Sequence, residues 1–198
     1  MDETGGTTLE VYPLSPERWE DLETLFGERG ACGGCWCMYW RRPHADFEAD
    51  KGAGNREAMR ALVLRGAVPG LLAYAGSEPV GWISLGPRGD FPRLAASRIL
   101  KPLDERPVWS VVCFFLAKPW RGRSVAGRLL TAAVEFARGC GATLLEGYPV
   151  EPRQGRLPAP FVWTGLPPIF RRAGFHEAAR RSPTRPIFRL ELPPAEET

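Results

Sequence analysis

The sequence lacks the features that direct a chain to a membrane or to an oxidising compartment. Its first residues, MDETGGTTLEVYPL, contain no basic segment and no apolar core of the signal-peptide type. No uncharged apolar stretch is long enough to span a bilayer. The five cysteines are an odd number, which argues against a framework of disulfides. We therefore expect a cytoplasmic protein with reduced thiols and no membrane partner.

The chain also lacks an excess of charge of one sign and any low-complexity run. Its 26 Lys and Arg residues are scattered among 23 Asp and Glu residues, which gives a formal net charge of +3. This balance does not demand a nucleic-acid partner. With 44% hydrophobic and 25% charged residues in a length of 198, the composition is that of a globular chain, and the length suits one domain.

Twenty-two glycines and 20 prolines break the chain into short elements, whose order indicates the fold class. Alternating or continuous apolar runs predict strands at 9–14, 107–117 and 142–150, a hairpin at 69–87 and a closing hairpin after Gly174. Apolar residues at helical spacing predict helices after Ser15, over 55–66 and 125–139, and a short one near 165–173. Between them, 31–52 is expected to be an irregular loop, and 88–106 a loop with a short helix. The predicted order, β α α β β β α β α β β, is that of a mixed α/β (α+β) domain.

A basic, glycine-containing turn joins the buried strand to the longest predicted helix, in the stretch KPWRGRSVAGRLLTAAVEFARGCG at 118–141. The first four N–H groups of a helix have no partner within it, and the helix dipole adds positive potential there. Such a turn binds an anion when its side chains are small enough to leave the backbone open. Arg121 and Arg123 add charge, and the small residues are Gly122, Ser124, Ala126 and Gly127. We expect a pyrophosphate site here, the alternative being an ordinary tight turn before a crossover helix.

The turn is not of the two commonest nucleotide-binding types, because it lacks both the Gly-Lys-Ser/Thr of the P-loop and the three glycines of the dinucleotide fingerprint. It resembles motif A of the GNAT superfamily of N-acetyltransferases, in which a strand leads into R/Q-x-x-G-x-G/A and a helix. Arg121, Ser124 and Ala126 occupy the three defined positions. Ser124 stands in place of the first glycine, which the backbone would tolerate at a negative φ. A second resemblance, to motif B, lies in IFRRAGFHEAARR at 169–181, with its Gly-Phe pair at Gly174.

The resemblance extends over residues 8–192 and implies one GNAT-like domain, with a mixed central sheet of about six to seven strands flanked by helices. It implies an acetyl-CoA-dependent N-acetyltransferase, with acetyl-CoA or another acyl-CoA lying between two splayed parallel strands, 108–117 and 142–149. Backbone amides of the turn would hold the pyrophosphate, and the end of the first strand would pair with the pantetheine amides. The implied donor-binding residues are Phe114, Phe115, Leu116, Arg121, Gly122, Arg123, Ser124, Val125, Ala126 and Gly127.

The residues that carry the acid–base chemistry of this family are replaced in the sequence. Direct attack of a neutral amine on the thioester needs a base for the amine proton and an acid for the thiolate. Many members carry a glutamate base where this chain has Ser110, and a tyrosine acid where it has Phe170. We hypothesise indirect deprotonation through water held by Ser110 or Glu146, with Tyr148 as a substitute acid. The alternative is that Glu146 and Tyr148 only face water at a strand end.

The stretch ACGGCWCMYWRR places Cys32, Cys35 and Cys37 at C-x₂-C-x-C spacing. A tetrahedral zinc site would need a fourth ligand from elsewhere, such as His44 or Cys113. Because the chain has no second C-x₂-C and no H-x₃₋₅-H, we expect no metal, and thiols that pack in the interior.

The segment between the first two helices borders the acceptor pocket in proteins of the GNAT fold. The resemblance therefore implies that Trp36, Tyr39 and Trp40 form an aromatic wall for a small-molecule or peptide amine. The alternative is that these side chains pack beneath the loop as a small core of their own.

Three classes of function remain at this point. The first is N-acetyl transfer from acetyl-CoA to an amine. The second, motivated by Ser110 and Phe170, is a CoA-binding sensor or partner module that has lost transfer chemistry. The third, a zinc-dependent nucleic-acid module, is disfavoured by the incomplete ligand set and the modest charge. The acceptor cannot be named from the sequence, because such pockets are built from variable loops, and the oligomeric state is open, with a homodimer as one option.

Overall fold

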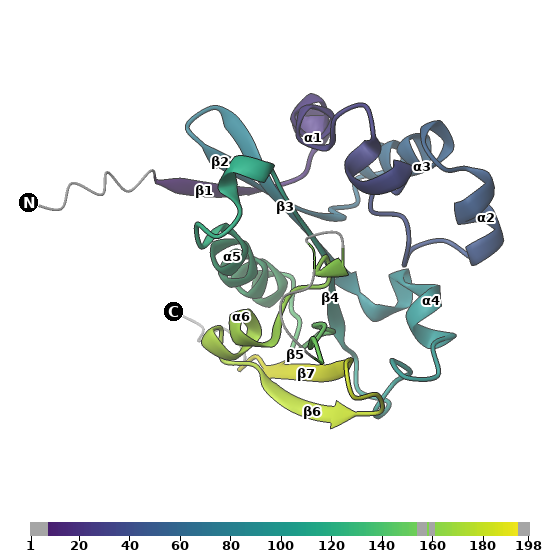
Figure 1. Ribbon diagram of the computed structural model, residues 1–198, viewed down its shortest axis with the longest axis vertical. Coiled ribbons are helices and arrows are strands. Elements are labelled where there is room, and N and C mark those ends of the chain that lie inside the picture. Colours follow the sequence, from purple (N-terminus) through teal and green to yellow (C-terminus); the bar gives the residue numbers. More distant parts are fainter. Residues whose placement is uncertain (1–7, 154–157, 159–160, 194–198) are drawn as a thin grey trace, which may run out of the picture.

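A seven-stranded mixed sheet forms the centre of the protein, with the strands in the order β1-β2-β3-β4-β5-β7-β6 (Figure 1). The computed structural model describes residues 8–153, 158 and 161–193. Strands β4 and β5 pair in parallel, and the other neighbours pair antiparallel. The strands are β1 (Leu9–Pro13), β2 (Gly70–Ala75), β3 (Glu78–Pro87), β4 (Trp109–Leu116), β5 (Leu144–Gly147), β6 (His176–Arg180) and β7 (Pro186–Glu191). The predicted fold class, a mixed sheet flanked by helices, is confirmed.

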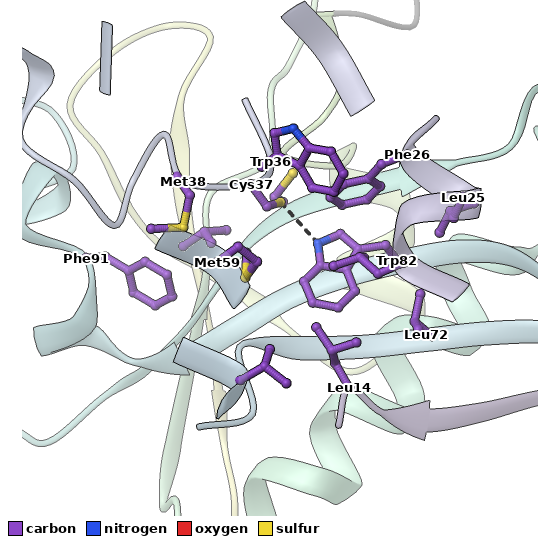
Figure 2. Packing of buried hydrophobic residues seen from close by; sticks show 14 of the residues in the cluster. Leu14, Leu25, Phe26, Trp36, Cys37, Met38, Met59, Leu72, Trp82 and Phe91 are labelled. Atoms are coloured by element: carbon purple, nitrogen blue, oxygen red, sulfur yellow. Dashed lines mark hydrogen bonds between the residues drawn. The ribbon is translucent and has the colours of Figure 1, made fainter. Parts of the chain in front are cut away.

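Helices cover both faces of the sheet. They are α1 (Trp19–Phe26), α2 (His44–Ala49), α3 (Ala53–Leu64), α4 (Pro92–Ala95), α5 (Val125–Gly139) and α6 (Pro167–Arg172). Helices α1 to α4 contribute to one hydrophobic core, and α5 and α6 to the other. Because successive side chains of a strand point to opposite faces, Leu71 of β2 belongs to the second core and its neighbour Leu72 to the first. Figure 2 shows the first core, where Leu14 and Met59 lie near the ring of Trp82.

Strand β4 is apolar almost throughout because it is buried on both faces. Val112 and Cys113 lie in the first core, whereas Val111 and Phe114 lie in the second. This agrees with the uninterrupted apolar run from which a doubly buried strand was predicted. The strand leads through a single turn of 3₁₀ helix, Lys118–Trp120, into the turn before α5.

Helix α5 begins at Val125 and packs one face on the sheet. Its buried residues are Val125, Leu129, Leu130, Ala133, Val134 and Ala137, which is the apolar stripe predicted from their spacing. The packing of α5 on the sheet therefore places the turn directly after the end of β4.

The segment 31–52 is more ordered than predicted. Helix α2 lies within it, although HADFEA has only one buried side chain, Phe47, and thus no helical stripe to signal it. Before it, the backbone of Gly30–Gly34 is kinked, with Ala31 at φ 68°. Ser15 does not cap a helix with its side chain as expected, because Pro16–Arg18 forms a 3₁₀ turn before α1 begins.

Within the part of the chain that the structure describes, no helix combines the length and the apolar character needed to cross a membrane.

Candidate active site

The two parallel strands separate after three paired residues. Trp109–Val111 of β4 pairs with Leu145–Gly147 of β5, and β4 then continues to Leu116 without β5 beside it. The chain itself bridges the gap, because the N–H of Phe114 donates to the carbonyl of Trp163 across 2.6 Å. The N–H of Val150, beyond β5, donates in the same way to the carbonyl of Gly165 across 3.0 Å.

A cavity of about 1440 Å³ opens along this gap. The end of β4 lines it together with the turn before α5, the cysteine-containing loop and the residues around α6. The cavity thus joins three stretches of the chain that lie far apart in the sequence, within 31–51, 113–127 and 151–172. Nine of the ten predicted donor-binding residues line it, and they are Phe114, Phe115, Leu116, Arg121, Gly122, Ser124, Val125, Ala126 and Gly127.

The turn before α5 leaves its backbone open to this cavity. A methyl group on Gly122 or Gly127 would meet no other atom within 4 Å. Gly122 has φ 80°, a conformation that glycine adopts without strain. Ser124 has φ 61°, so the negative φ at which serine would replace the glycine without strain is not adopted. Ser124 is thus in the left-handed conformation just before Val125, which costs a serine about 1–2 kcal/mol.

Positive charge gathers here from the turn itself and from helix α6. Arg121 lines the cavity and donates from Nε to the carbonyl of Leu116 across 3.2 Å. Arg123, the tenth predicted donor-binding residue, does not line it, and its guanidinium lies over the ring of Trp120 instead. Two further arginines line the cavity from the end of α6, Arg171 and Arg172. Sequence reasoning missed this pair, although the RR of the motif-B stretch was the available signal.

The aromatic wall is built from a different set than predicted. Tyr39 and Trp40 line the cavity, but Trp36 does not. Trp36 is 6% exposed and stacks on Trp19 in the first core, with 6.2 Å between ring centroids. Trp163 takes its place, at 5.2 Å from the ring of Tyr39 and 5.8 Å from that of Trp40. Trp36 therefore packs in the core beneath the loop, as in the alternative prediction, whereas Tyr39 and Trp40 line the cavity.

Ser110, Glu146 and Tyr148 form a buried network outside the walls of the cavity. The Tyr148 hydroxyl lies 2.8 Å from Ser110 Oγ and donates to Glu146 across 2.7 Å. Glu146 also accepts hydrogen bonds from Arg88 Nη1 and Arg189 Nε, each at 2.8 Å. The expectation that Glu146 and Tyr148 face water was wrong, since they are 1% and 0% exposed.

The electrostatics of this network hold the tyrosine in its neutral form. Burial, and then the charge of Glu146, raise the pKa of Tyr148 well above its ordinary value. Arg189 continues the network to Asp104, with Nη1 and Oδ2 2.5 Å apart. The network therefore ties the loop after β3 to β5 and β7. The assignment of these residues as base and acid stays a prediction, and any such action would have to pass through intervening groups.

Phe170 fills the interior beneath the gap between the strands. Its side chain is 0% exposed and contacts the ring of Phe114, with 6.0 Å between ring centroids. A methyl group on either Gly147 or Gly165 would collide with the Phe170 ring. A phenyl ring offers no proton, so this position supplies packing and no acid.

Four cysteines line the cavity, Cys32, Cys35, Cys37 and Cys113. Cys37 Sγ accepts a hydrogen bond from Trp82 Nε1 across 3.1 Å (Figure 2). Within the described residues, the His, Cys, Asp and Glu side chains form no group of three or more that could hold a metal ion. The C-x₂-C-x-C spacing therefore does not assemble the tetrahedral zinc site that was weighed as an alternative.

Comparisons with known proteins agree with this geometry. The family model of the GNAT acetyltransferases matches residues 33–153. A GNAT-family acetyltransferase structure from Streptococcus agalactiae is 13% identical, with a TM-score of 0.57 over 93% of this chain and 96% of that one. PaiA N-acetyltransferase from Thermoplasma acidophilum, solved with coenzyme A, is 15% identical, with a TM-score of 0.53 over 93% and 99% of the two chains. YncA from Salmonella typhimurium, solved with acetyl-CoA, is 11% identical, with a TM-score of 0.52 over 96% of each chain. Such likenesses show the fold, and a search of curated proteins gives no significant match.

Proposed function

Since the chain belongs to the GNAT family of acetyltransferases, we propose that it transfers an acetyl group from acetyl-CoA to the amine of a small-molecule or peptide acceptor. One observation carries this proposal. A single cavity runs from the open turn before α5 to the aromatic residues of the loop before α2. A transferase must bring two substrates together, and this cavity has one end suited to a phosphorylated donor and another suited to an apolar or cationic acceptor.

The donor end fits the diphosphate of CoA. The N–H groups at the start of α5 have no partner within the helix, and the open space at Gly122 and Gly127 lets phosphate oxygens approach them. Arg121, Arg171 and Arg172 supply charge for the phosphates. The volume of about 1440 Å³ exceeds the roughly 300–1,000 Å³ of an ordinary small-molecule pocket, as a long donor and an acceptor together require.

The acceptor end is formed by Tyr39, Trp40 and Trp163. Their faces offer apolar contact and a negative quadrupole, which suit the hydrocarbon and the amine of an acceptor. The amine must be neutral when it attacks, so its proton has to leave before or during the reaction. Glu146 and Tyr148 would take part only through water, because neither they nor their neighbour Ser110 line the cavity.

We also propose that residues 8–192 form one domain. Both hydrophobic cores share the same sheet, in which β1 from the start of this range and β7 from its end both take part. A boundary anywhere along the chain would split one of these cores.

Thermal unfolding with acetyl-CoA, CoA and ATP in parallel tests donor binding. A ligand at a hundredfold excess over its dissociation constant should stabilise the protein by about 2.7 kcal/mol. We expect both CoA species to raise the midpoint and ATP to leave it unchanged. Replacing Arg121, Arg171 and Arg172 singly by alanine should shrink the shift, whereas Arg138→Ala on the far end of α5 should not. Equal midpoint shifts in all variants, or no shift in the native protein, would show that CoA does not bind at this end of the cavity.

A second candidate function is CoA binding without transfer, which Ser110 and Phe170 favour because neither can serve as base or acid. The two functions differ in turnover. Release of CoA thiol from acetyl-CoA, measured with a mixture of primary amines, should exceed the rate without enzyme if the protein is a transferase. A raised midpoint with acetyl-CoA and no turnover with any amine would instead support the binding module.

A further inference from the structure

The carbonyl of Trp163 lies on the edge of β4 along which the donor is expected to bind. Strand β4 pairs with β5 only over Trp109–Val111, and β5 does not continue beside its later residues. The N–H of Phe114 is nevertheless bonded, because it donates to the Trp163 carbonyl across 2.6 Å. The chain thus supplies a partner of its own where the strand edge would otherwise be free for a ligand.

Phe114 and Leu116 direct their N–H groups toward the same side of β4. In an antiparallel pair, alternate residues bond to the neighbouring strand. The N–H of Ala117 donates to Val80 of β3 across 3.0 Å, whereas that of Phe114 points away from β3. By this alternation the N–H of Leu116 also points away from β3, and both residues line the cavity. The pantetheine arm of CoA, with its two amides, can pair with both residues only if Trp163 gives up its bond to Phe114.

A tight turn, Val162–Gly165, presents Trp163 to β4, and we call it the bridging turn. The N–H of its last residue donates to the carbonyl of its first across 2.8 Å. Its last residue is also fixed from outside, because the Gly165 carbonyl accepts the N–H of Val150 across 3.0 Å and a methyl group on Gly165 would collide with Phe170. These contacts hold Gly165 in place independently of Trp163.

The contacts that hold Trp163 itself are of kinds that a donor can replace. Within the described residues, its backbone makes one hydrogen bond, the one to Phe114. A carbonyl of the pantetheine arm would offer Phe114 the same kind of acceptor, so exchanging one for the other changes the free energy little. The Trp163 ring is half-buried and packs on Tyr39 and Trp40 at the cavity wall.

We propose that the bridging turn closes the pantetheine end of the donor site in the free protein, and that acyl-CoA displaces the Trp163 carbonyl from Phe114 when it binds. This inference rests on the proposed function, because it requires acyl-CoA in the cavity. Since the ring of Trp163 belongs to the aromatic wall, donor binding also rearranges the acceptor end. The acceptor site takes its final form only after this step, so the donor binds first.

The displacement gives the Trp163 side chain an effect on CoA affinity that is opposite in sign to that of a binding residue. A protein that must open a site before it binds shows a dissociation constant raised in proportion to the closed fraction. Removing the contacts that keep the turn closed therefore tightens the binding of CoA. Removing a side chain that only lines the site would weaken it.

Calorimetric titration of Trp163→Ala with CoA measures this sign. We expect the dissociation constant to fall roughly threefold or more, because the ring no longer holds the turn against Tyr39 and Trp40. Adenosine 3′,5′-bisphosphate, which lacks the pantetheine arm, should gain nothing from the substitution. Trp109→Ala is the matched control, since this ring is also half-buried but does not line the cavity, and its affinity for CoA should be native.

Fluorine NMR on protein labelled with 5-fluorotryptophan tests the displacement with the turn intact. The seven tryptophans each give a resonance, and Trp163→Phe identifies the one from Trp163. We expect CoA to shift this resonance and adenosine 3′,5′-bisphosphate to leave it in place. A Trp163 resonance that CoA does not move would overturn the proposal, whether or not Trp163→Ala folds.

The unfavourable outcomes of the titration separate the two proposals. A dissociation constant for CoA that rises or stays native in Trp163→Ala would overturn the displacement and leave the donor site standing. An equal gain in affinity for CoA and for adenosine 3′,5′-bisphosphate would also overturn it, because the pantetheine arm would then not compete with the turn. No binding of CoA to either the native protein or Trp163→Ala would overturn both proposals together.

Discussion

The N–H of Phe114 donates to the carbonyl of Trp163 across 2.6 Å, at the point where β4 continues beyond its pairing with β5. The ring of Trp163 packs on Tyr39 at the same time, with 5.2 Å between centroids. One residue therefore bridges the gap between the strands with its backbone and forms part of the aromatic wall of the cavity with its side chain. Its position depends on Gly165, which has φ 85° and lies against Phe170 and Phe114.

Gly165→Ala should destabilise the protein by about 2–5 kcal/mol, from left-handed backbone strain and from the collision of the new methyl group with Phe170. Gly66→Ala is the matched control. Gly66 has φ 81° but open space around it, so its replacement should cost only the backbone term of about 1–2 kcal/mol. Urea unfolding of both variants measures the difference. Equal losses of unfolding free energy would mean that the Phe170 ring moves aside and leaves room for the new methyl group.

Ser124→Gly should stabilise the protein by about 1–2 kcal/mol, because glycine adopts φ 61° without the clash that serine suffers. The Ser124 side chain makes no capping hydrogen bond that the change would remove. The affinity for CoA should hold or improve. Ser124→Val, with a β-branched side chain at the same φ, should lower the thermal midpoint. A lower midpoint for the glycine variant would assign a structural role to the hydroxyl.

Replacing Trp36 or Trp40 by alanine should affect different properties, the stability of the fold in the first case and the binding of the acceptor in the second. Trp36→Ala should cost about 3–5 kcal/mol of stability, since the ring is buried against Trp19 and Phe26. Trp40→Ala should cost less, because Trp40 is half-buried at the cavity wall, and should raise the KM for the acceptor several-fold. Trp36→Phe serves as a milder variant if alanine prevents folding. If Trp36→Phe raised the KM for the acceptor while its stability stayed native, Trp36 would take part in acceptor binding.

Glu146→Gln should destabilise the protein by about 3–5 kcal/mol, because it leaves the charges of Arg88 and Arg189 without their buried partner. Glu135→Gln, which breaks an exposed pair with Arg138, should change stability by less than about 1 kcal/mol. Once an acceptor is known, the kcat/KM of folded Glu146→Gln should stay near that of the native protein across pH. A large loss of kcat/KM with a shifted pH profile would show that the network moves the proton of the amine.

Stability should fall with rising pH because of Cys35. Burial raises the pKa of this thiol from 9.0 to about 11 in the folded protein. Since the unfolded state loses the proton first, the contribution of this group is fully present below about pH 9 and is lost as pH rises toward 11. Cys35→Ser should flatten the decline in that interval when unfolding free energies are compared. An unchanged slope would indicate that the thiol is better solvated than its place in the loop implies.

The pattern of the chain was sufficient to predict most helices and strands and the open turn before α5. Apolar periodicity placed α5 and β4, because a helix packed on a sheet and a doubly buried strand leave strong periodic signals. The small residues after β4 were sufficient to predict an open turn at the start of α5, and the binding of an anion there stays a prediction. Helix α2 left no such signal, because Phe47 is its one buried residue.

Side-chain direction in the irregular segments, in contrast, was decided by packing between distant parts of the chain. Trp36, Cys37 and Trp40 are close neighbours in sequence, yet the first is buried in the core, the second reaches β3 and the third lines the cavity. No periodicity relates residues in a kinked loop, so each orientation follows from the partner it meets, and Trp163 joins the same wall from the other end of the chain. The burial of Glu146 could not be predicted for the same reason, since it depends on Arg88 and Arg189, whose approach only the folded sheet brings about.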